Sequence, residues 1–246
     1  MQHIVRIKTG TSGWSYAAWK GRFYPVDLPA RRMLGAYAAR LDAVEANGTF
    51  YRMPRPATLR DWREQVPDGF TFALKAPQRI THFARLLPQA AEPLSAFLRA
   101  AAELGEKLGP VLFQLPPTVK RDLPRLRDFL ALLGLGGRAA FEFRDPSWFD
   151  DGVLGALSDA GVALCLADGD EGETPLVPTA PFGYLRLRRR GYDAAALCRW
   201  AARLGAQPWE EAFVFFKHED EAQGPRLALE LATIVAGRDA APAALS

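Results

Sequence analysis

The stretch AVEANGTF, residues 43–50, combines the apolar side chains of a buried strand with polar side chains at alternating positions. If Val44 and Ala46 face a layer of helices, Glu45 and Asn47 face the other side of the sheet. A carboxylate on an interior face is costly unless something pairs with it or a ligand needs it. The stretch therefore predicts a strand with a polar inner face near its carboxyl end.

Similar short apolar segments recur along the chain, and helical stretches with an apolar stripe separate most of them. The eight predicted strands are residues 7–13, 43–50, 70–77, 110–116, 139–144, 162–168, 182–188 and 212–217. One connection differs, because residues 169–181 are rich in Gly and Pro and predict a crossover without a full helix. Strands that alternate with helices indicate a parallel sheet.

Eight such units in a chain of 246 residues favour a single TIM-like (β/α)8 barrel, an α/β fold. We assign the barrel to residues 1–237 and a flexible C-terminal tail to residues 238–246. The alternative, an open doubly wound sheet, normally carries a glycine-rich phosphate loop after its first strand. The segment GTSGW (10–14) does not match that pattern.

The same alternation puts polar residues on the inner face of several other predicted strands. They gather toward the carboxyl ends, where barrel enzymes place their active sites. The inward set that we predict comprises Glu45, Asn47, Lys75, Gln114, Glu142, Arg144, Asp168, Tyr184, Arg186, Arg188 and Lys217. A structural salt-bridge lattice is the alternative. Buried ion pairs seldom add net stability over apolar packing, which favours a functional barrel mouth.

The composition of the chain indicates where the protein resides and what charge of ligand suits it, but not which reaction it catalyses. The formal net charge is +3 with 49% hydrophobic residues, which is compatible with an anionic ligand and below a nucleic-acid-binding signature. The N-terminal residues lack the pattern of a signal peptide, and no stretch is apolar over the length of a membrane span. We expect a cytoplasmic protein with no membrane contact and two reduced cysteines. The sequence does not indicate an oligomeric state.

Five longer motifs resemble the YecE-like family, also called domain of unknown function 72. They are TGTSGWSYAAWKGRFYP (9–25), VEANGTFYRMP (44–54), FALKAPQRITH (72–82), LGPVLFQLPP (108–117) and FEFRDPSW (141–148). The resemblance implies a TIM-like barrel in the cytoplasm and no established reaction, although a relation to sugar isomerases has been suggested for the family. The segments YLRLRRRGY (184–192) and FFKHED (215–220) depart from its pattern.

We predict an enzyme acting on a small anionic or phosphorylated molecule by isomerase, lyase or hydrolase chemistry. The predicted catalytic residues are Glu45 and Glu142 as candidate bases and Lys75, which steadies a developing oxyanion. Arginine clamps phosphate or carboxylate through paired hydrogen bonds. The predicted ligand-binding residues are Thr11, Trp14, Tyr16, Asn47, Tyr51, His82, Gln114, Arg144, Asp168, Tyr184, Arg186 and Lys217.

Several alternatives stay open. Lys75 also suits Schiff-base chemistry if its pKa is depressed. A divalent metal held by His82, His218 and the carboxylates is possible but not favoured, because no tight histidine spacing supports it. The aromatic loops and the arginines of LRLRRR (185–190) suit nucleic acid, whose binding would depend steeply on salt. A sensor that binds the ligand without turnover is a third function.

Overall fold

Parallel strands form a closed ring in the computed structural model, which describes residues 4–133, 138–217 and 220–240. Within these residues, eight parallel strands pair in the order β1-β2-β3-β4-β5-β6-β8-β9, and β9 pairs with β1 to close the barrel. The strands are β1 (Arg6–Ser12), β2 (Ala43–Ala46), β3 (Thr71–Lys75), β4 (Leu108–Gln114), β5 (Ala139–Glu142), β6 (Ala163–Gly169), β8 (Phe182–Leu187) and β9 (Glu211–Phe216). The predicted (β/α)8 barrel is confirmed.

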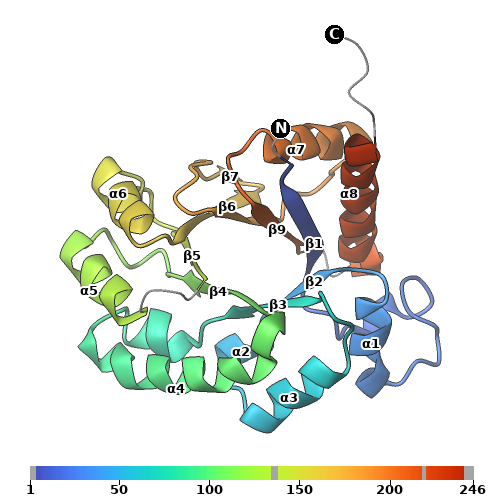
Figure 1. Ribbon diagram of the computed structural model, residues 1–246, viewed down its shortest axis with the longest axis horizontal. Helices are drawn as coiled ribbons and strands as arrows, with labels where there is room; N and C mark the ends of the chain where they lie inside the picture. Colours follow the sequence, from blue (N-terminus) through green and yellow to red (C-terminus); the bar gives the residue numbers. More distant parts are fainter. Residues whose placement is uncertain (1–3, 134–137, 218–219, 241–246) are drawn as a thin grey trace.

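The helices lie outside the strands, as Figure 1 shows in a view along the barrel. They are α1 (Met33–Ala38), α2 (Gly48–Tyr51), α3 (Pro56–Glu64), α4 (Ala91–Ala101), α5 (Leu123–Leu133), α6 (Asp151–Asp159), α7 (Ala194–Gly205) and α8 (Gln223–Ala240). Helix α8 continues three residues past the predicted domain boundary at Gly237, and residues 241–246 lie outside the described part of the chain. Within the described ranges, no helix combines the length and apolarity that crossing a membrane requires.

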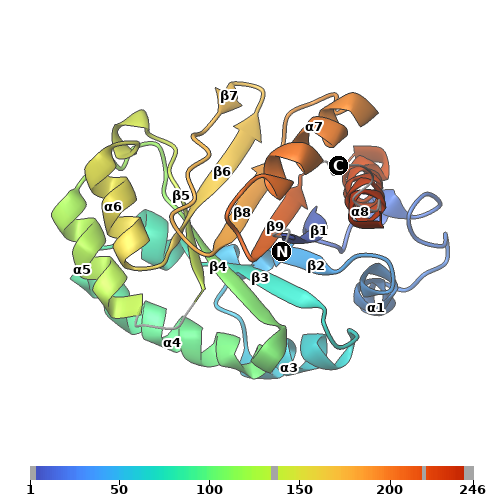
Figure 2. The same ribbon diagram turned by 45° about the horizontal axis from the view of Figure 1, so that its top comes forward.

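The connection between β6 and β8 contains no helix, as the sequence predicts. It begins with a short antiparallel turn in which β7 (Gly172–Glu173) pairs with the end of β6. Figure 2 shows β7 beyond the end of β6, outside the ring of parallel strands. The Gly- and Pro-rich sequence explains this arrangement, because glycine permits the tight turn and proline disfavours a helix interior.

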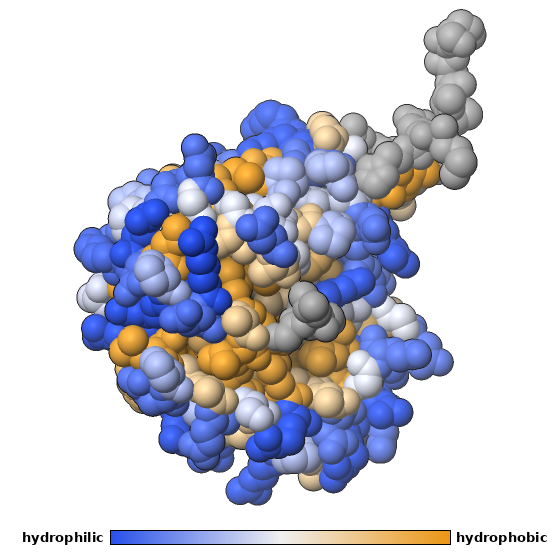
Figure 3. Space-filling view, turned by 60° about the vertical axis from the view of Figure 1, so that its left-hand side comes forward, coloured by the Kyte–Doolittle hydropathy of each residue, from blue (hydrophilic) through white to orange (hydrophobic). Residues whose placement is uncertain are grey.

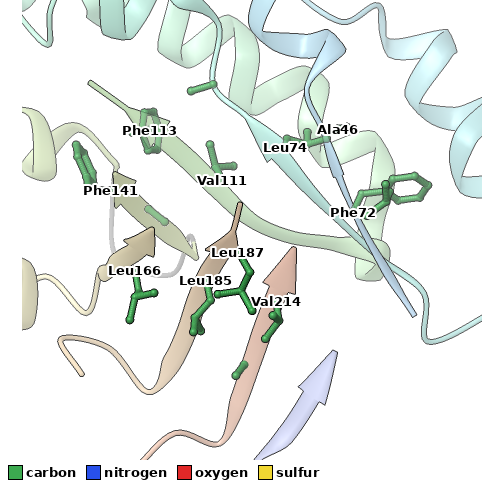
Figure 4. Close-up of a cluster of buried hydrophobic side chains, with 14 of the residues drawn as sticks. Ala46, Phe72, Leu74, Val111, Phe113, Phe141, Leu166, Leu185, Leu187 and Val214 are labelled. Carbon is green, nitrogen blue, oxygen red and sulfur yellow. The ribbon is translucent and has the colours of Figure 1, made fainter. Parts of the chain in front are cut away.

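The outer face of the barrel is apolar and packs on the helices. Figure 4 shows side chains of this face, and the labelled ones belong to β2, β3, β4, β5, β6, β8 and β9. The labelled residues are Ala46, Phe72, Leu74, Val111, Phe113, Phe141, Leu166, Leu185, Leu187 and Val214, all of them buried. They are the alternating positions that the sequence assigns to the helix-facing side, so the predicted strand parity holds for most of the barrel.

The lower interior of the barrel is filled by side chains of complementary size. Small residues on one side, such as Ala43, Ala73 and Ala140, lie in one cluster with the rings of Phe213 and Phe215. Large aromatic rings therefore occupy the space that the alanines leave, which is how a narrow barrel reaches close packing. The polar inner residues lie above this apolar layer, toward the carboxyl ends of the strands.

Candidate functional site

A buried ion cluster occupies the carboxyl end of the barrel interior. Arg186 on β8 lies between Glu45 on β2 and Glu142 at the end of β5, and all three side chains are at most 3% exposed. Arg186 Nη2 donates to Glu45 Oε1 at 2.9 Å, and Nη1 donates to Glu142 Oε2. Three residues that strand parity predicts to face inward are thus in direct contact.

Glu45 is fully hydrogen-bonded. Ser12 Oγ donates to its Oε1 at 2.7 Å, and the Tyr184 hydroxyl donates to its Oε2 at 2.8 Å. Burial alone would raise the pKa of Glu45, but the Arg186 charge and these hydrogen bonds outweigh it, so the pKa lies below the ordinary value. Burial and the Glu45 charge raise the pKa of Tyr184 well above its ordinary value, so the phenol stays protonated and donates.

Glu142 is surrounded by arginines. Besides Arg186, it accepts a hydrogen bond from Arg188 Nη2 at 2.6 Å and one from Arg144 Nε at 3.3 Å. Burial opposes ionisation here too, yet Arg186, Arg188 and Arg144 together hold the pKa of Glu142 well below its usual range. A carboxylate of such low pKa is a poor proton acceptor at neutral pH. The geometry thus gives Glu45 and Glu142 the role of fixed counter-charges more readily than that of the predicted bases.

Lys75 is the contrasting group at the same end of the barrel. Its Nζ lies 3.9 Å from the centroid of the Phe50 ring, and the described side chains offer it no hydrogen-bond or ion-pair partner. Burial, and then the nearby Arg186 charge, lower the pKa of Lys75 to about 8, although Glu45 and Glu142 oppose the change. Lys75 is therefore the side chain of the cluster that can exchange a proton near neutral pH.

His82 lies beside Lys75. It belongs to a π-helical turn, Arg79–Phe83, that follows β3, and its ring meets Phe50 edge-on with the ring centroids 4.9 Å apart. Its Nδ1 is 2.9 Å from the Thr81 hydroxyl. Burial and the charges of Lys75 and Arg144 lower the pKa of His82, which keeps the imidazole neutral at physiological pH. π-helical turns of this kind are frequent at functional sites.

Three further predicted residues line the interior close to this cluster. Asn47 follows β2, and its buried Oδ1 has no hydrogen-bond partner among the described residues. Gln114 is paired in register with Glu142 and is 4% exposed. Tyr184 holds Glu45 as described above. The predicted strand 43–50 is shorter than expected, because β2 ends at Ala46 and residues 48–51 form α2.

Two predicted ligand-binding residues face the helices instead. Asp168 is in register with the outward Leu187, accepts a hydrogen bond from the Tyr192 hydroxyl at 2.6 Å and pairs with Arg189. Thr11 donates to the Gly13 carbonyl at 2.6 Å and contacts the Tyr37 hydroxyl. The inward placement of Asp168 in the sequence analysis was wrong. At the carboxyl end of β1, the inward polar residue is Ser12, one position after Thr11.

The remaining predicted residues lie around the rim or pack within loops. Trp14 packs edge-on against Trp62 with ring centroids 4.8 Å apart, and the Tyr16 hydroxyl donates to the Ser12 carbonyl at 2.6 Å. Both side chains hold the loop after β1 in place. Tyr51 is 74% exposed, and Lys217 is exposed directly after β9. His218, which the metal alternative invokes, lies outside the described residues.

Three residues of the cluster, Ser12, Phe50 and Arg188, are not among the predicted ligand-binding or catalytic residues. Ser12 was within reach, because it alternates with Gly10 along the inner face of β1. Arg188 was identified as an inward residue, but nothing in the sequence says that it reaches Glu142. Among the described residues, no group of three or more His, Cys, Asp and Glu side chains is arranged to hold a metal ion.

A second hollow lies on the side of the barrel, away from this cluster. A pocket of about 500 Å³ is lined by Leu86, Leu87, Phe129 and Leu132, with Asp122 and Arg125 among its polar residues. Figure 3 shows apolar surface framed by hydrophilic residues on the side that Figure 1 draws at the left. Asp122 and Arg125 pair with each other at 2.9 Å. Glu45, Lys75 and Glu142, whose pKa values are shifted, lie at the mouth and not in this pocket.

These features define a (β/α)8 barrel with a polar, positively charged mouth. The model of the family described as "Protein of unknown function DUF72" matches residues 8–245, so the chain belongs to this family. The resemblance seen in the sequence motifs is thereby confirmed.

Curated relatives agree with this assignment. The chain is 34% identical over 147 residues to the UPF0759 protein YecE of Escherichia coli, across 59% of this chain and 51% of that protein. It is 30% identical over 230 residues to the UPF0759 protein YunF of Bacillus subtilis, across 87% of this chain and 79% of the relative. The chain therefore spans about half the length of YecE and most of YunF.

Solved structures of DUF72 family proteins share the fold. A protein from Thermotoga maritima superposes with a TM-score of 0.75 at 24% identity, over 94% of this chain and 99% of that chain. One from Enterococcus faecalis gives a TM-score of 0.75 at 19% identity, over 94% and 95%. At these identities the likeness establishes the fold alone. The family has no established activity, so function has to be argued from the site.

Proposed function

We propose that the protein is an enzyme that binds a small anionic molecule, such as a phosphorylated sugar, at the carboxyl end of the barrel. The observation that carries this proposal is the charge balance of the mouth. Among its described side chains, four cations (Lys75, Arg144, Arg186 and Arg188) accompany two carboxylates (Glu45 and Glu142). An anionic ligand would offset the surplus.

Two of these arginines are suited to hold the anion. Each is bonded to Glu142 through a single nitrogen, Nε of Arg144 and Nη2 of Arg188. Their side chains are 41% and 22% exposed, whereas Arg186 is 3% exposed and is fixed between the glutamates. The remaining N–H groups of Arg144 and Arg188 are therefore available for phosphate or carboxylate oxygens. Arg186 organises the site without meeting the ligand directly.

The reaction class that fits best is proton transfer next to a carbonyl group, as in sugar isomerisation. Such a step needs an acid–base group that titrates near neutral pH. Lys75 has this character, because burial lowers its pKa to about 8, while both glutamates are held ionised and His82 is held neutral by a lowered pKa. The buried Oδ1 of Asn47, which has no hydrogen-bond partner among the described residues, supports a role for Asn47 as acceptor of a hydrogen bond from a substrate hydroxyl.

Ligand binding tests this proposal. Glyceraldehyde 3-phosphate, ribose 5-phosphate and inorganic phosphate should raise the thermal midpoint of the protein, and the unphosphorylated sugars should not. Arg144→Gln should weaken phosphate binding about tenfold, the loss of roughly one charge-assisted hydrogen bond. Arg226→Gln, which removes a surface arginine paired with Glu230, is the matched control. Equal phosphate affinity in both variants would refute anion binding at the mouth.

A second candidate function is the binding of single-stranded nucleic acid across the rim. It is favoured by two exposed aromatic rings, Tyr51 at 74% and Phe83 at 69%. Tyr51 ends α2 and Phe83 ends the π-helical turn after β3, and these two segments touch through the rings of Phe50 and His82. Bases stack on such rings. Oligonucleotide affinity that falls steeply with salt and is lost in Tyr51→Ala would favour this function. Phosphosugar binding at the buried arginines should respond to salt much less.

A further inference from the structure

Lys75 differs from Lys8, another lysine of the barrel interior, in that no described residue offers its amine a hydrogen bond or an ion pair. Lys8, at the opposite end, donates to the Gly69 carbonyl at 2.9 Å and to the Thr71 hydroxyl at 2.6 Å, and it lies 3.8 Å from Glu211. These contacts occupy Lys8 in the structure of the barrel floor. Lys75 has only the face of Phe50, among the described residues, and is partly open to the mouth.

The two glutamates near Lys75 already accept hydrogen bonds from other side chains. Both oxygens of Glu45 and both oxygens of Glu142 accept hydrogen bonds from other groups, and Arg186 is shared between them. A lysine kept in the protein only for charge pairing would compete for one of these carboxylates. Here the arginines take them, which leaves the amine of Lys75 directed to something other than a salt bridge.

We propose that Lys75 forms a covalent iminium with the carbonyl carbon of a small anionic aldehyde or ketone, whose anionic group Arg144 and Arg188 hold. This inference rests on the proposed function and names its substrate class and the role of the lysine. The observations that carry it are the place of Lys75 at the carboxyl end of β3, the absence of a hydrogen-bond or ion-pair partner for its amine among the described residues, and the arginines at the same end of the barrel.

Formation of the iminium from the Lys75 amine and the carbonyl compound balances in atoms and charge. The lone pair of the neutral Lys75 amine attacks the carbonyl carbon, a C–N bond forms, and the carbonyl oxygen takes up a proton to give a carbinolamine. The amine nitrogen releases one proton, and the protonated hydroxyl leaves as water to give the iminium. The net change is amine plus carbonyl plus one proton to iminium plus water, with no oxidant or reductant.

The iminium then prepares the proton transfer that the proposed function requires. The positive nitrogen draws electrons through the iminium carbon, so a C–H bond on the next carbon loses its proton more readily. The electron pair of that C–H bond forms a C=C bond, and the C=N π pair moves to nitrogen to give an enamine. The neutral imidazole of His82 lies on the same side of the mouth and is suited to accept that proton. Lys75 thus acts as nucleophile and His82 as base.

The electrostatics of the mouth support the nucleophilic role. Because burial lowers the pKa of Lys75 from 10.5 to about 8, roughly 300-fold more of its amine is neutral at pH 7 than for an ordinary lysine. The neighbouring cations Arg186 and Arg144 act in the same direction, which is a known way to activate a Schiff-base lysine.

Reductive trapping tests the proposal. The protein is incubated with glyceraldehyde 3-phosphate and cyanoborohydride at pH 7, and the modified lysines are mapped by peptide mass spectrometry. We expect a single major adduct at Lys75, at least tenfold above any other lysine, and suppressed by excess inorganic phosphate. Unphosphorylated glyceraldehyde should label Lys75 at least tenfold more slowly. Lys8→Met should leave the labelling unchanged, whereas Lys75→Met should abolish the major adduct.

The outcomes separate the two proposals. Calorimetry with inorganic phosphate reports anion binding alone. Phosphate binding without an adduct at Lys75 overturns the covalent step and leaves the proposed function standing. Absence of both overturns both. Adducts spread over surface lysines also overturn the covalent step. Because the adducts are mapped on the wild-type protein, the test remains valid even if Lys75→Met does not fold.

Discussion

Arg186 and Glu45 are joined across the barrel interior by an ion pair of 2.9 Å between Nη2 and Oε1, with side chains that are 3% and 0% exposed. The same guanidinium reaches Glu142 from the other side, so one cation ties β2, β5 and β8 together at their carboxyl ends. This bridge fixes the floor of the mouth, at the same end of the barrel as Lys75, Arg144 and Arg188.

Arg186→Lys should destabilise the protein by about 3–5 kcal/mol, because a single ammonium cannot bond both glutamates and one buried carboxylate loses its partner. Urea denaturation at pH 7 measures the difference. Arg203→Lys is the matched control, since Arg203 pairs with Glu173 on the surface, and it should cost less than about 1 kcal/mol. Similar losses in the two variants would contradict the structural role of Arg186.

Glu142→Gln should change the acid stability of the protein. The folded pKa of Glu142 lies well below the ordinary value of 4.5, so its contribution is fully present above pH 4.5 and is lost as the pH falls. We expect a loss of about 3–5 kcal/mol at pH 7 that narrows below pH 4.5, where the wild-type glutamate begins to lose this advantage. Denaturation curves at pH 7, 5 and 3.5 measure it. A difference independent of pH would argue against an ionised Glu142.

Gly10→Ala should prevent stable folding. A Cβ at Gly10 would lie 1.9 Å from the Ala43 carbonyl oxygen, and that oxygen belongs to the backbone of β2, where it cannot move aside. Gly155→Ala is the contrasting variant, because nothing lies within 4 Å of its Cβ and Gly155 is inside α6. It should stabilise the protein by about 0.5–1 kcal/mol through helix propensity. Soluble yield and thermal midpoint distinguish the two.

The barrel could be predicted from the sequence because the pattern that marks each strand lies within a few consecutive residues. Alternation of apolar residues at Phe72, Leu74, Leu185 and Leu187 reveals both the strands and the face that packs on helices. The same parity places Glu45, Glu142 and Arg186 inside. Asp168 could have been assigned by the same rule, since Leu164 and Leu166 face outward and Asp168 continues their side of β6.

The pairing within the site could not be predicted, because it depends on reach across the barrel. Residues 141 positions apart, Glu45 and Arg186, meet only when the ring closes. From the alternation of inward and outward residues alone, Lys75 and Arg186 are equally good candidates to form ion pairs with Glu45 and Glu142. Only the geometry shows that the longer, forked guanidinium bonds both carboxylates and that Lys75 has no ion-pair partner within the part of the chain that the structure describes. The different surroundings of Arg186 and Lys75 are therefore a property of the assembled mouth.

Lys75→Met should stabilise the protein at neutral pH, by about 1–3 kcal/mol, because burial of the charged amine opposes folding. The folded pKa of about 8 lies below the unfolded value of 10.5, so the unfolded chain holds the proton more tightly. Below pH 8 both states are protonated and the cost is fully present. Between pH 8 and 10.5 the folded protein has released the proton while the unfolded chain still holds it, so wild-type stability rises relative to the variant.

Urea denaturation of both proteins between pH 6.5 and 10 measures this effect. The stability difference should be constant up to about pH 8 and then shrink. Lys217→Met removes an exposed lysine beyond the end of β9 and controls for the loss of one charge. A difference that stays constant to pH 10 would mean that Lys75 is charged in the folded protein throughout. The amine would then lack the neutral form that attack on a carbonyl requires.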